Sequence, residues 1–140
     1  MGQLSSAIDI EVPFYDVDAL KVVWHGHYVK YFELARCKLL EKVGYTYDEM
    51  AVSGYYFPVI DLQVRYIKPI KFCQKITVTA VLVEWEHRLV IKYLITDSVS
   101  SERLTKAKTV QVAVAMPDQI TQYVCPDVLI GNIEKALLKL

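Results

Sequence analysis

Residues 28–44 read YVKYFELARCKLLEKVG, and this stretch decides which fold the rest of the chain must adopt. Its apolar side chains recur every three or four positions, the period of an amphipathic α-helix. They are Tyr28, Tyr31, Phe32, Ala35, Leu39 and Val43. Val29, Leu34 and Leu40 widen this apolar stripe, and Gly44 is placed to end the helix. We therefore predict a helix over residues 28–43 that more than one neighbour covers.

Alternating apolar and polar residues on both sides of this helix predict five β-strands. One strand precedes the helix and four follow it, at residues 7–14, 57–67, 75–85, 88–96 and 106–116. The connections between the last four are short and polar or turn-forming, which favours antiparallel neighbours. Thr46 and Glu49 have the capping-box spacing of a short helix that should end near Gly54. A last helix is predicted at 128–139, with Asp127 as its cap.

One apolar face of such a sheet must be covered, and one long apolar helix is available to cover it. We therefore predict an α+β fold in which a five-stranded antiparallel sheet wraps around a long central helix, as one domain over residues 1–140. The opposite face of the sheet is too apolar for water alone, so we predict a subunit contact through it. Its apolar residues are Val81, Val83, Trp85, Val90 and Leu94.

Composition narrows the possible functions. The chain has 16 basic and 16 acidic residues, interspersed and without a basic tail, so nucleic-acid binding is not indicated. The odd set of Cys37, Cys73 and Cys125 contains no CxxC pair, which predicts reduced thiols in a cytoplasmic protein. No apolar run is long enough for a membrane span, and Met1 to Ser6 lack a signal-peptide pattern.

The segment that carries the chemistry is residues 14–36, FYDVDALKVVWHGHYVKYFELAR. Asp16 and Asp18 follow the first strand, and His25 lies where the long helix begins. A helix start offers free N–H donors that suit an oxyanion. A carboxylate near them could attack a thioester carbonyl or take a proton from attacking water. From spacing alone, an Asp in this position is more often a turn or cap residue, so both interpretations stay open.

The pattern Asp-x-Asp-x-x-x-Val-Val-x-His-x-x-Tyr, from Asp16 to Tyr28, resembles the signature of the 4-hydroxybenzoyl-CoA thioesterase family. It is most similar to the short-chain acyl-CoA thioesterase branch, the YbgC-like proteins found with the Tol-Pal system. Tyr66 to Pro69 resembles the recurrent Tyr-x-x-Pro element of the family. The resemblance implies a hotdog fold and a homodimer or tetramer with active sites at the subunit interface. It also implies a thioester of coenzyme A or of an acyl carrier protein as substrate, with no metal and no separate cofactor.

The same resemblance assigns roles to individual residues. It makes Asp18 the catalytic group, as nucleophile or general base, and the backbone N–H at His25 the oxyanion donor, with Gly26 at the same helix entry. It leaves four further candidates for substrate binding, Lys21, Trp24, His27 and Tyr28. The chain departs from the family pattern at three places, which leaves the substrate open. These are Lys21, where the family usually has Gly, His27, where it has Asn or Ser, and Cys73-Gln74, where it has Gly-Asp.

Simpler roles are expected for several neighbouring residues. Asp16 is expected in a turn or a structural hydrogen bond, and Glu33 in an ion pair with Arg36 three positions on. An aromatic group could line an acyl pocket, but most of it is expected in the core or at a dimer contact. It comprises Trp24, Tyr28, Tyr31, Phe32, Tyr55, Tyr56 and Phe57. Arg65, Lys68 and Lys71 could bind the phosphates of coenzyme A or be solvated.

Two other functions are alternatives to thioester hydrolysis. A hotdog hydratase or dehydratase would pair an Asp with a His five residues on, but Val23 occupies that position and His25 lies seven residues beyond Asp18. A non-catalytic module that binds acyl groups stays open, because Lys21 and His27 depart from the family pattern. A metal site built from Asp16, Asp18, His25 and His27 is not expected, because histidines two apart at a helix start point in different directions.

Overall fold

The computed structural model describes residues 3–140, so residues 1 and 2 of the predicted domain lie outside the described part. The order up to the second helix is β1 (Ser5–Glu11), the short 3-10 helices η1 (Phe14–Asp16) and η2 (His25–His27), α1 (Tyr28–Lys42) and α2 (Tyr47–Ser53). The order after it is β2 (Tyr55–Tyr56), β3 (Val59–Tyr66), β4 (Lys75–Glu84), β5 (Leu89–Asp97), β6 (Arg103–Gln111), β7 (Val114–Ala115), β8 (Ile120–Thr121) and α3 (Asp127–Leu138).

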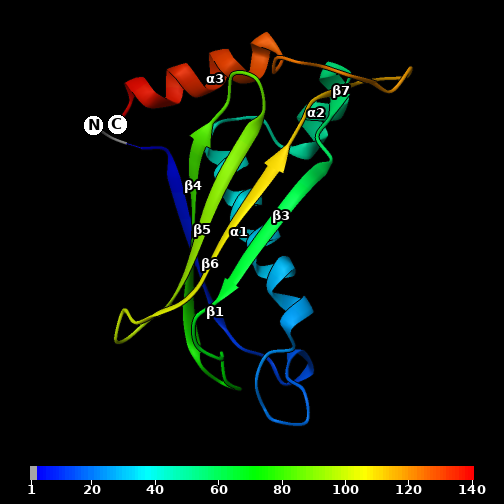
Figure 1. Cartoon of the computed structure of the whole chain (residues 1–140). Coiled ribbons are helices and arrows are strands. Elements are labelled where there is room, and N and C mark those ends of the chain that lie inside the picture. Colours follow the sequence, from blue (N-terminus) through cyan, green and yellow to red (C-terminus); the bar gives the residue numbers. More distant parts are fainter. Residues whose placement is uncertain (1–2) are drawn as a thin grey trace.

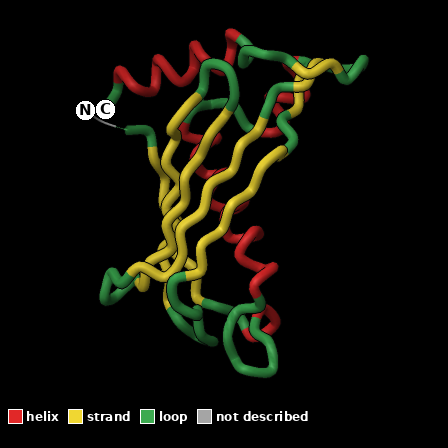
Figure 2. The backbone as a smooth tube through the Cα atoms, in the orientation of Figure 1, coloured by secondary structure: helices red, strands yellow, loops and turns green. Residues whose placement is uncertain are grey.

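The main sheet is antiparallel and has five strands in the order β1-β4-β5-β6-β3. It twists around α1, which lies along one face, while α3 lies across one end (Figure 1). The tube view shows the same twist in the strands and the long loops at the opposite end (Figure 2). The predicted architecture is therefore confirmed. The small sheet of β2, β7 and β8 was not predicted, because its strands are only two residues long.

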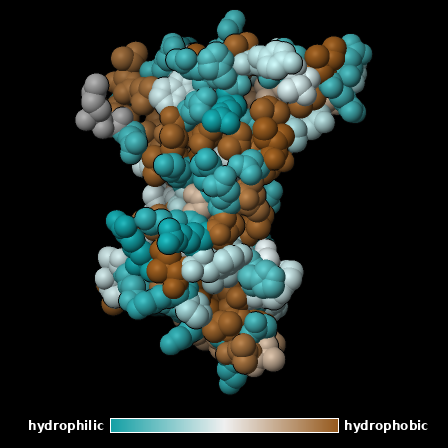
Figure 3. All heavy atoms as spheres, in the orientation of Figure 1, coloured by the Kyte–Doolittle hydropathy of each residue, from teal (hydrophilic) through white to brown (hydrophobic). Residues whose placement is uncertain are grey.

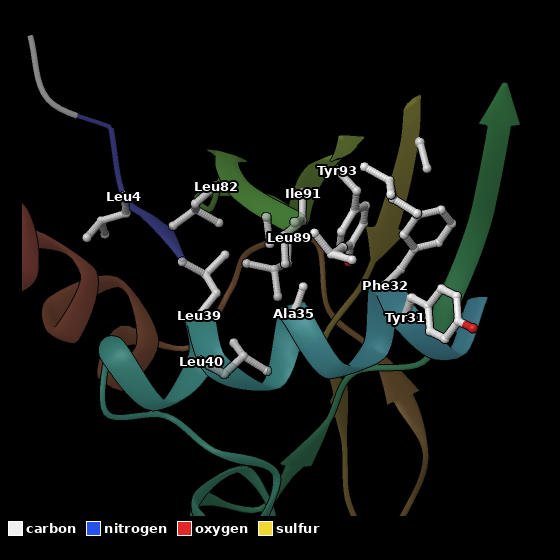
Figure 4. Close-up of a cluster of buried hydrophobic side chains, with 14 of the residues drawn as sticks. Leu4, Tyr31, Phe32, Ala35, Leu39, Leu40, Leu82, Leu89, Ile91 and Tyr93 are labelled. Atoms are coloured by element: carbon white, nitrogen blue, oxygen red, sulfur yellow. The ribbon is translucent and has the colours of Figure 1, made fainter. Parts of the chain in front are cut away.

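The core lies between α1 and the inner face of the sheet. Phe32, Ala35 and Leu39 of α1 point toward the side chains of β4 and β5 (Figure 4). The alternation over residues 75–85 and 88–96 predicts one apolar face on each of these strands, and both predictions are confirmed, since every member is buried. They are Ile76, Val78, Ala80 and Leu82 on β4, and Leu89, Ile91, Tyr93 and Ile95 on β5. Fully burying one large apolar side chain contributes about 1.5–3 kcal/mol, so this layer dominates the stability of the fold.

Two predicted strands are present but differ in detail from the prediction. The first strand ends at Glu11, and Phe14 is 75% exposed instead of buried. The alternation over residues 106–116 predicts Val110, Val112, Val114 and Met116 together on one apolar face, but β6 ends at Gln111. Its cross-strand partners on β5 place Thr105, Ala107, Thr109 and Gln111 on the inner face. Thr109 pairs with the Tyr93 hydroxyl at 2.8 Å, and the Gln111 side-chain amide donates to the Phe57 carbonyl at 2.7 Å. The Thr105 hydroxyl and the Gln111 Oε1 atom are buried without a hydrogen-bond partner among the described residues.

The helix ends mostly follow the sequence signals. Thr46 and Glu49 form the predicted capping box, and Gly44 follows α1 with a φ of 68°, a left-handed conformation that glycine adopts at little cost. The predicted cap of α3 was wrong, because Pro126 occupies the cap position and Asp127 is the first helical residue. The Asp127 carboxylate there still interacts favourably with the helix dipole. None of the helices in residues 3–140 is both long enough and apolar enough to cross a membrane.

Candidate active site

Residues 17–23 form a small hairpin between β1 and α1. Val17 and Val23 pair in antiparallel fashion, and the Asp18 N–H donates to the Val22 carbonyl at 2.9 Å. The Lys21 N–H donates back to the Asp18 carbonyl at 2.9 Å, which closes a tight turn. Lys21 has a φ of 62°, a conformation that costs any residue with a Cβ and suits glycine. This explains in physical terms why glycine is usual at this position in the resembling family.

Asp18 is the first residue of that turn and its side chain is exposed in the single chain. Its Oδ1 atom accepts a hydrogen bond from the Leu20 N–H at 2.8 Å, as in an Asx turn. The loop around it also exposes large apolar side chains. They are Phe14 at 75%, Tyr15 at 78%, Leu20 at 81% and Trp24 at 48%. A loop that exposes several large apolar side chains together with a carboxylate is typical of a surface that a partner or an apolar ligand covers.

Asp16 has the opposite surroundings and is buried. Its carboxylate accepts hydrogen bonds from the Lys30 ammonium at 2.5 Å and from the Tyr31 hydroxyl at 2.7 Å. Burial alone would raise the pKa of Asp16, but the bonds from Lys30 and Tyr31 outweigh it and hold the pKa below its usual value. Burial and the neighbouring carboxylate raise the pKa of Tyr31. Asp16 therefore anchors the loop to the first turns of α1, in line with the structural role expected for it.

The helix entry is held from two sides. The Trp24 N–H donates to the Asp16 carbonyl at 3.0 Å, and the Tyr66 hydroxyl at the end of β3 donates to the His25 carbonyl at 2.6 Å. The N–H groups of His25 and Gly26 open η2, so helix geometry gives them no acceptor within the helix. Outside the helices, no backbone hydrogen bond among the described residues uses them. These two donors are therefore free to bind a developing oxyanion.

Trp24 lies directly over Gly26. A Cβ atom added at Gly26 would come within 2.2 Å of the Trp24 ring, so only glycine permits this approach. The same ring is 4.9 Å from the His25 ring and 5.3 Å from the His27 ring, measured between centroids. The structure thus brings four of the predicted site residues into one cluster at the helix entry.

The remaining predicted residues are placed differently. Tyr28 is buried, its ring contacts that of Tyr66 edge-on at 4.8 Å, and burial raises its pKa, so it belongs to the core beneath the site. The Lys21 side chain is exposed. The expected ion pair of Glu33 and Arg36 is confirmed at 3.3 Å.

Two contributors were not assigned from the sequence. Lys30 was missed because its partner Asp16 lies fourteen positions earlier, and only the folded loop brings them together. The Tyr66 hydroxyl was missed although its Tyr-x-x-Pro element was recognised. In residues 3–140, no group of three or more His, Cys, Asp or Glu side chains is arranged to hold a metal ion.

Comparison with known proteins identifies the family. The model of the thioesterase-like superfamily matches residues 12–123, which is most of the chain. The chain therefore belongs to the thioesterase-like superfamily, as the resemblance implied. The structure of a DHNA-CoA thioesterase from Staphylococcus aureus superposes with a TM-score of 0.82 and is 28% identical, covering 96% of this chain and 89% of that one. The fold is accordingly the hotdog fold.

Two curated relatives match parts of the chain. YneP of Bacillus subtilis, provisionally named an acyl-CoA thioesterase, is 31% identical over 77 residues, which are 55% of this chain and 53% of that protein. ATL3 of Arabidopsis thaliana, named a chloroplastic acyl-acyl carrier protein thioesterase, is 29% identical over 73 residues, 52% of this chain and 38% of that protein. The chain spans about half the length of the first curated relatives it matches.

Proposed function

We propose that this chain hydrolyses acyl thioesters, with the Asp18 carboxylate as its catalytic group and the N–H groups of His25 and Gly26 as its oxyanion hole. One observation carries the proposal. Two carboxylates lie two residues apart: Asp16 is buried and paired with Lys30, whereas Asp18 is exposed and accepts one hydrogen bond, from Leu20. Asp18 belongs to a hairpin that leads directly into a helix start with unused N–H groups. The relatives support the reaction type, because each is named for an acyl thioester substrate.

The proposed reaction uses the Asp18 carboxylate and the N–H groups at the helix entry. Asp18 takes a proton from water as the water oxygen attacks the thioester carbonyl, or it attacks the carbonyl itself and forms an anhydride that water then opens. Negative charge develops on the carbonyl oxygen in both routes, and the free N–H groups of His25 and Gly26 stabilise it. The carbon–sulfur bond then breaks, and the thiolate leaves and takes up a proton. The products are a free acid and a free thiol.

We also propose that the site is completed by a second copy of the chain. Strand β3 is at one edge of the sheet, and its outward side has no strand partner in the single chain. It and the loop that follows expose a row of large apolar side chains. They are Val59, Ile60, Leu62, Tyr66 and Ile67, each between 39% and 59% exposed. An apolar edge strand of this kind is a site for strand pairing, and Tyr66 connects it to the helix entry through His25.

The test is a panel of coenzyme A thioesters, aliphatic and aromatic, in which thiol release is followed with a thiol reagent. Asp18→Asn is expected to lower kcat by about a hundredfold to ten-thousandfold, the usual contribution of a general base. The fold should survive, because Asp18 makes only one side-chain hydrogen bond. Asp118→Asn removes an exposed carboxylate between β7 and β8 and is the matched control.

Three results would contradict the proposal. Full activity in Asp18→Asn would exclude this residue from the mechanism. Hydration of crotonyl-CoA without thiol release would indicate a hydratase. An acyl ligand that binds but is never cleaved from any thioester would indicate a binding module.

A further inference from the structure

The outer face of the main sheet, turned away from α1, carries a cluster of five cations. They belong to three neighbouring strands, β5, β6 and β3, and line a groove of about 670 Å³ together with the half-buried Val81 and Leu94. Figure 3 views the molecule from this side and shows hydrophilic side chains across the middle of the sheet. We call this surface the basic groove and define it by Arg65, Lys92, Arg103, Lys106 and Lys108.

Like charges face each other directly across the strands of this groove. Lys92 on β5 is opposite Lys108 on β6, and Lys106 on β6 is opposite Arg65 on β3. Directly opposed like charges destabilise a sheet. Every ion pair found in residues 3–140 uses other cations, so these five charges have no carboxylate partner there. The chain has as many acidic as basic residues, so acidic groups were available and lie elsewhere.

A second copy of the chain does not fit this face. A two-fold contact through the groove would place five cations against five cations, and such like-charge contacts are strongly unfavourable. The groove therefore opposes the subunit contact predicted through Val81 and Leu94, and it calls for an anionic occupant of another kind.

Among the described residues, the groove offers no backbone nest for a small phosphate, no stacking platform for nucleic-acid bases and no protruding apolar side chains for a membrane. Strands β5 and β6 are paired on both sides, so their N–H groups are used in the ladders and form no anion-binding nest. Tyr93 is the one aromatic residue among the described lining residues, and it is buried against Phe32 of α1, so bases have no stacking platform. The surface is hollow, and Val81 and Leu94 do not protrude as membrane-inserting side chains do.

An acidic amphipathic helix matches the groove in spacing and in polarity. Side chains two positions apart on one strand, such as Lys106 and Lys108, are about 6.8 Å apart along it. Carboxylates at positions i and i+4 of a helix are about 6 Å apart along its axis. Val81 and Leu94, on the β4 and β5 side, offer an apolar strip beside the cations.

The groove lies close to the candidate active site, because its lining residue Arg65 is near the end of β3. Arg65 precedes Tyr66, the residue that holds the helix entry through the His25 carbonyl. The backbone N–H groups of Ile67 and Lys68 then donate to the Leu104 carbonyl, one residue from Arg103. A partner bound in the groove would therefore lie next to Tyr66, which contacts the helix entry of the candidate active site.

We propose that the basic groove docks the acidic helix of an acyl carrier protein, which presents the acyl thioester on its flexible arm. This inference rests on the proposed thioester hydrolysis and names the form in which the acyl group arrives. It predicts that carrier-bound substrate is recognised by charge in the groove, whereas the same acyl group on coenzyme A is not.

The test compares one acyl group on coenzyme A and on a purified acyl carrier protein, using the double variant Lys106→Glu/Lys108→Glu. We expect KM for the carrier-bound thioester to rise by about tenfold or more, with kcat unchanged. The KM for the coenzyme A thioester should stay the same. Lys135→Glu/Lys139→Glu on and just after α3 makes the same charge change at exposed positions outside the groove and should leave both substrates unaffected. The groove variant should fold, because Glu at position 108 would face Lys92 as an opposite charge.

Binding of the unacylated carrier protein, followed by fluorescence anisotropy, separates the two proposals. Salt-sensitive binding that the groove variant loses supports the docking inference, even if neither thioester is cleaved and the proposed hydrolysis fails. Hydrolysis of both thioesters with equal KM in the parent and the groove variant overturns the docking inference and leaves hydrolysis standing. Binding of anionic vesicles or RNA to the groove in place of the carrier protein also overturns it.

Discussion

At the scale of single residues, Asp16 and Asp18 show how the fold buries one of two similar carboxylates and leaves the other exposed. Asp16 stabilises the loop through Lys30 and Tyr31, and Asp18 keeps its carboxylate exposed. We predict that Asp16→Asn lowers the free energy of unfolding by about 2 kcal/mol at pH 7, the usual worth of hydrogen bonds to a buried charge. Urea unfolding would measure it, and Asp18→Asn, which loses no buried contact, is the matched comparison.

The difference in stability between the parent and Asp16→Asn is expected to become smaller at low pH. The pKa of Asp16 is lower in the folded protein, so its contribution is fully present above its unfolded pKa of about 3.9 and is lost as the pH falls through the folded value. The parent and Asp16→Asn should therefore approach each other in stability below about pH 4. An equal stability of the two proteins at pH 7 would show that Asp16 does not anchor the loop.

Lys21 gives a second test at this scale, because its left-handed backbone conformation disfavours any residue with a Cβ. Lys21→Gly is expected to keep or raise the stability by up to about 1 kcal/mol, whereas the β-branched Lys21→Val should lower it by about 1–2 kcal/mol. Thermal unfolding would compare them. A KM that is the same in the parent and Lys21→Gly would also exclude Lys21 from substrate binding.

At the scale of elements, local patterns predicted the parts of the fold that local physics controls. Apolar periodicity predicts helix α1 and the inner faces of β4 and β5. Apolar side chains recur at nearly every turn of α1 and at alternate positions of the two strands, and these side chains are buried. Strand β6 failed because its inner face carries Thr109 and Gln111, whose burial depends on partners from Tyr93 and Phe57. Those partners are distant in the sequence, so the residues of β6 alone do not indicate them.

The candidate site divides in the same way. The free donors of the helix entry follow from the predicted helix start, and Asp18 was selected by resemblance to a family rather than by periodicity. The contacts of Asp16 with Lys30, and of Tyr66 with His25, could not be predicted, because they require the loop to fold back onto α1 and β3. Family patterns therefore identify the chemical groups, and the fold determines which of them are left free to react.

At the scale of the whole molecule, the single chain leaves two surfaces incomplete, and they differ in chemistry. The basic groove carries five cations and repels a second copy, whereas the β3 edge exposes mainly apolar side chains beside Asp61 and Arg65, and Tyr66 at its end contacts the helix entry. An unpaired edge strand is a template for pairing with another chain, and exposed apolar side chains along it favour that pairing. The β3 edge is therefore the surface at which self-association is expected, and it would bring a second chain to the active site.

We predict that Ile60→Lys/Ile67→Lys prevents this pairing, since lysine on an edge strand opposes strand addition. Both side chains are exposed in the single chain, at 59% and 43%, so each protomer should still fold. The dissociation constant of the dimer should rise by about tenfold or more, equivalent to about 1.4 kcal/mol, when followed by sedimentation at several concentrations. Thiol release per chain should fall in parallel.

Val52→Lys/Leu138→Lys, at positions that are 90% and 87% exposed on α2 and α3, is the control. Monomers of the β3 variant that hydrolyse thioesters at the parent rate would show that one chain alone forms the complete site.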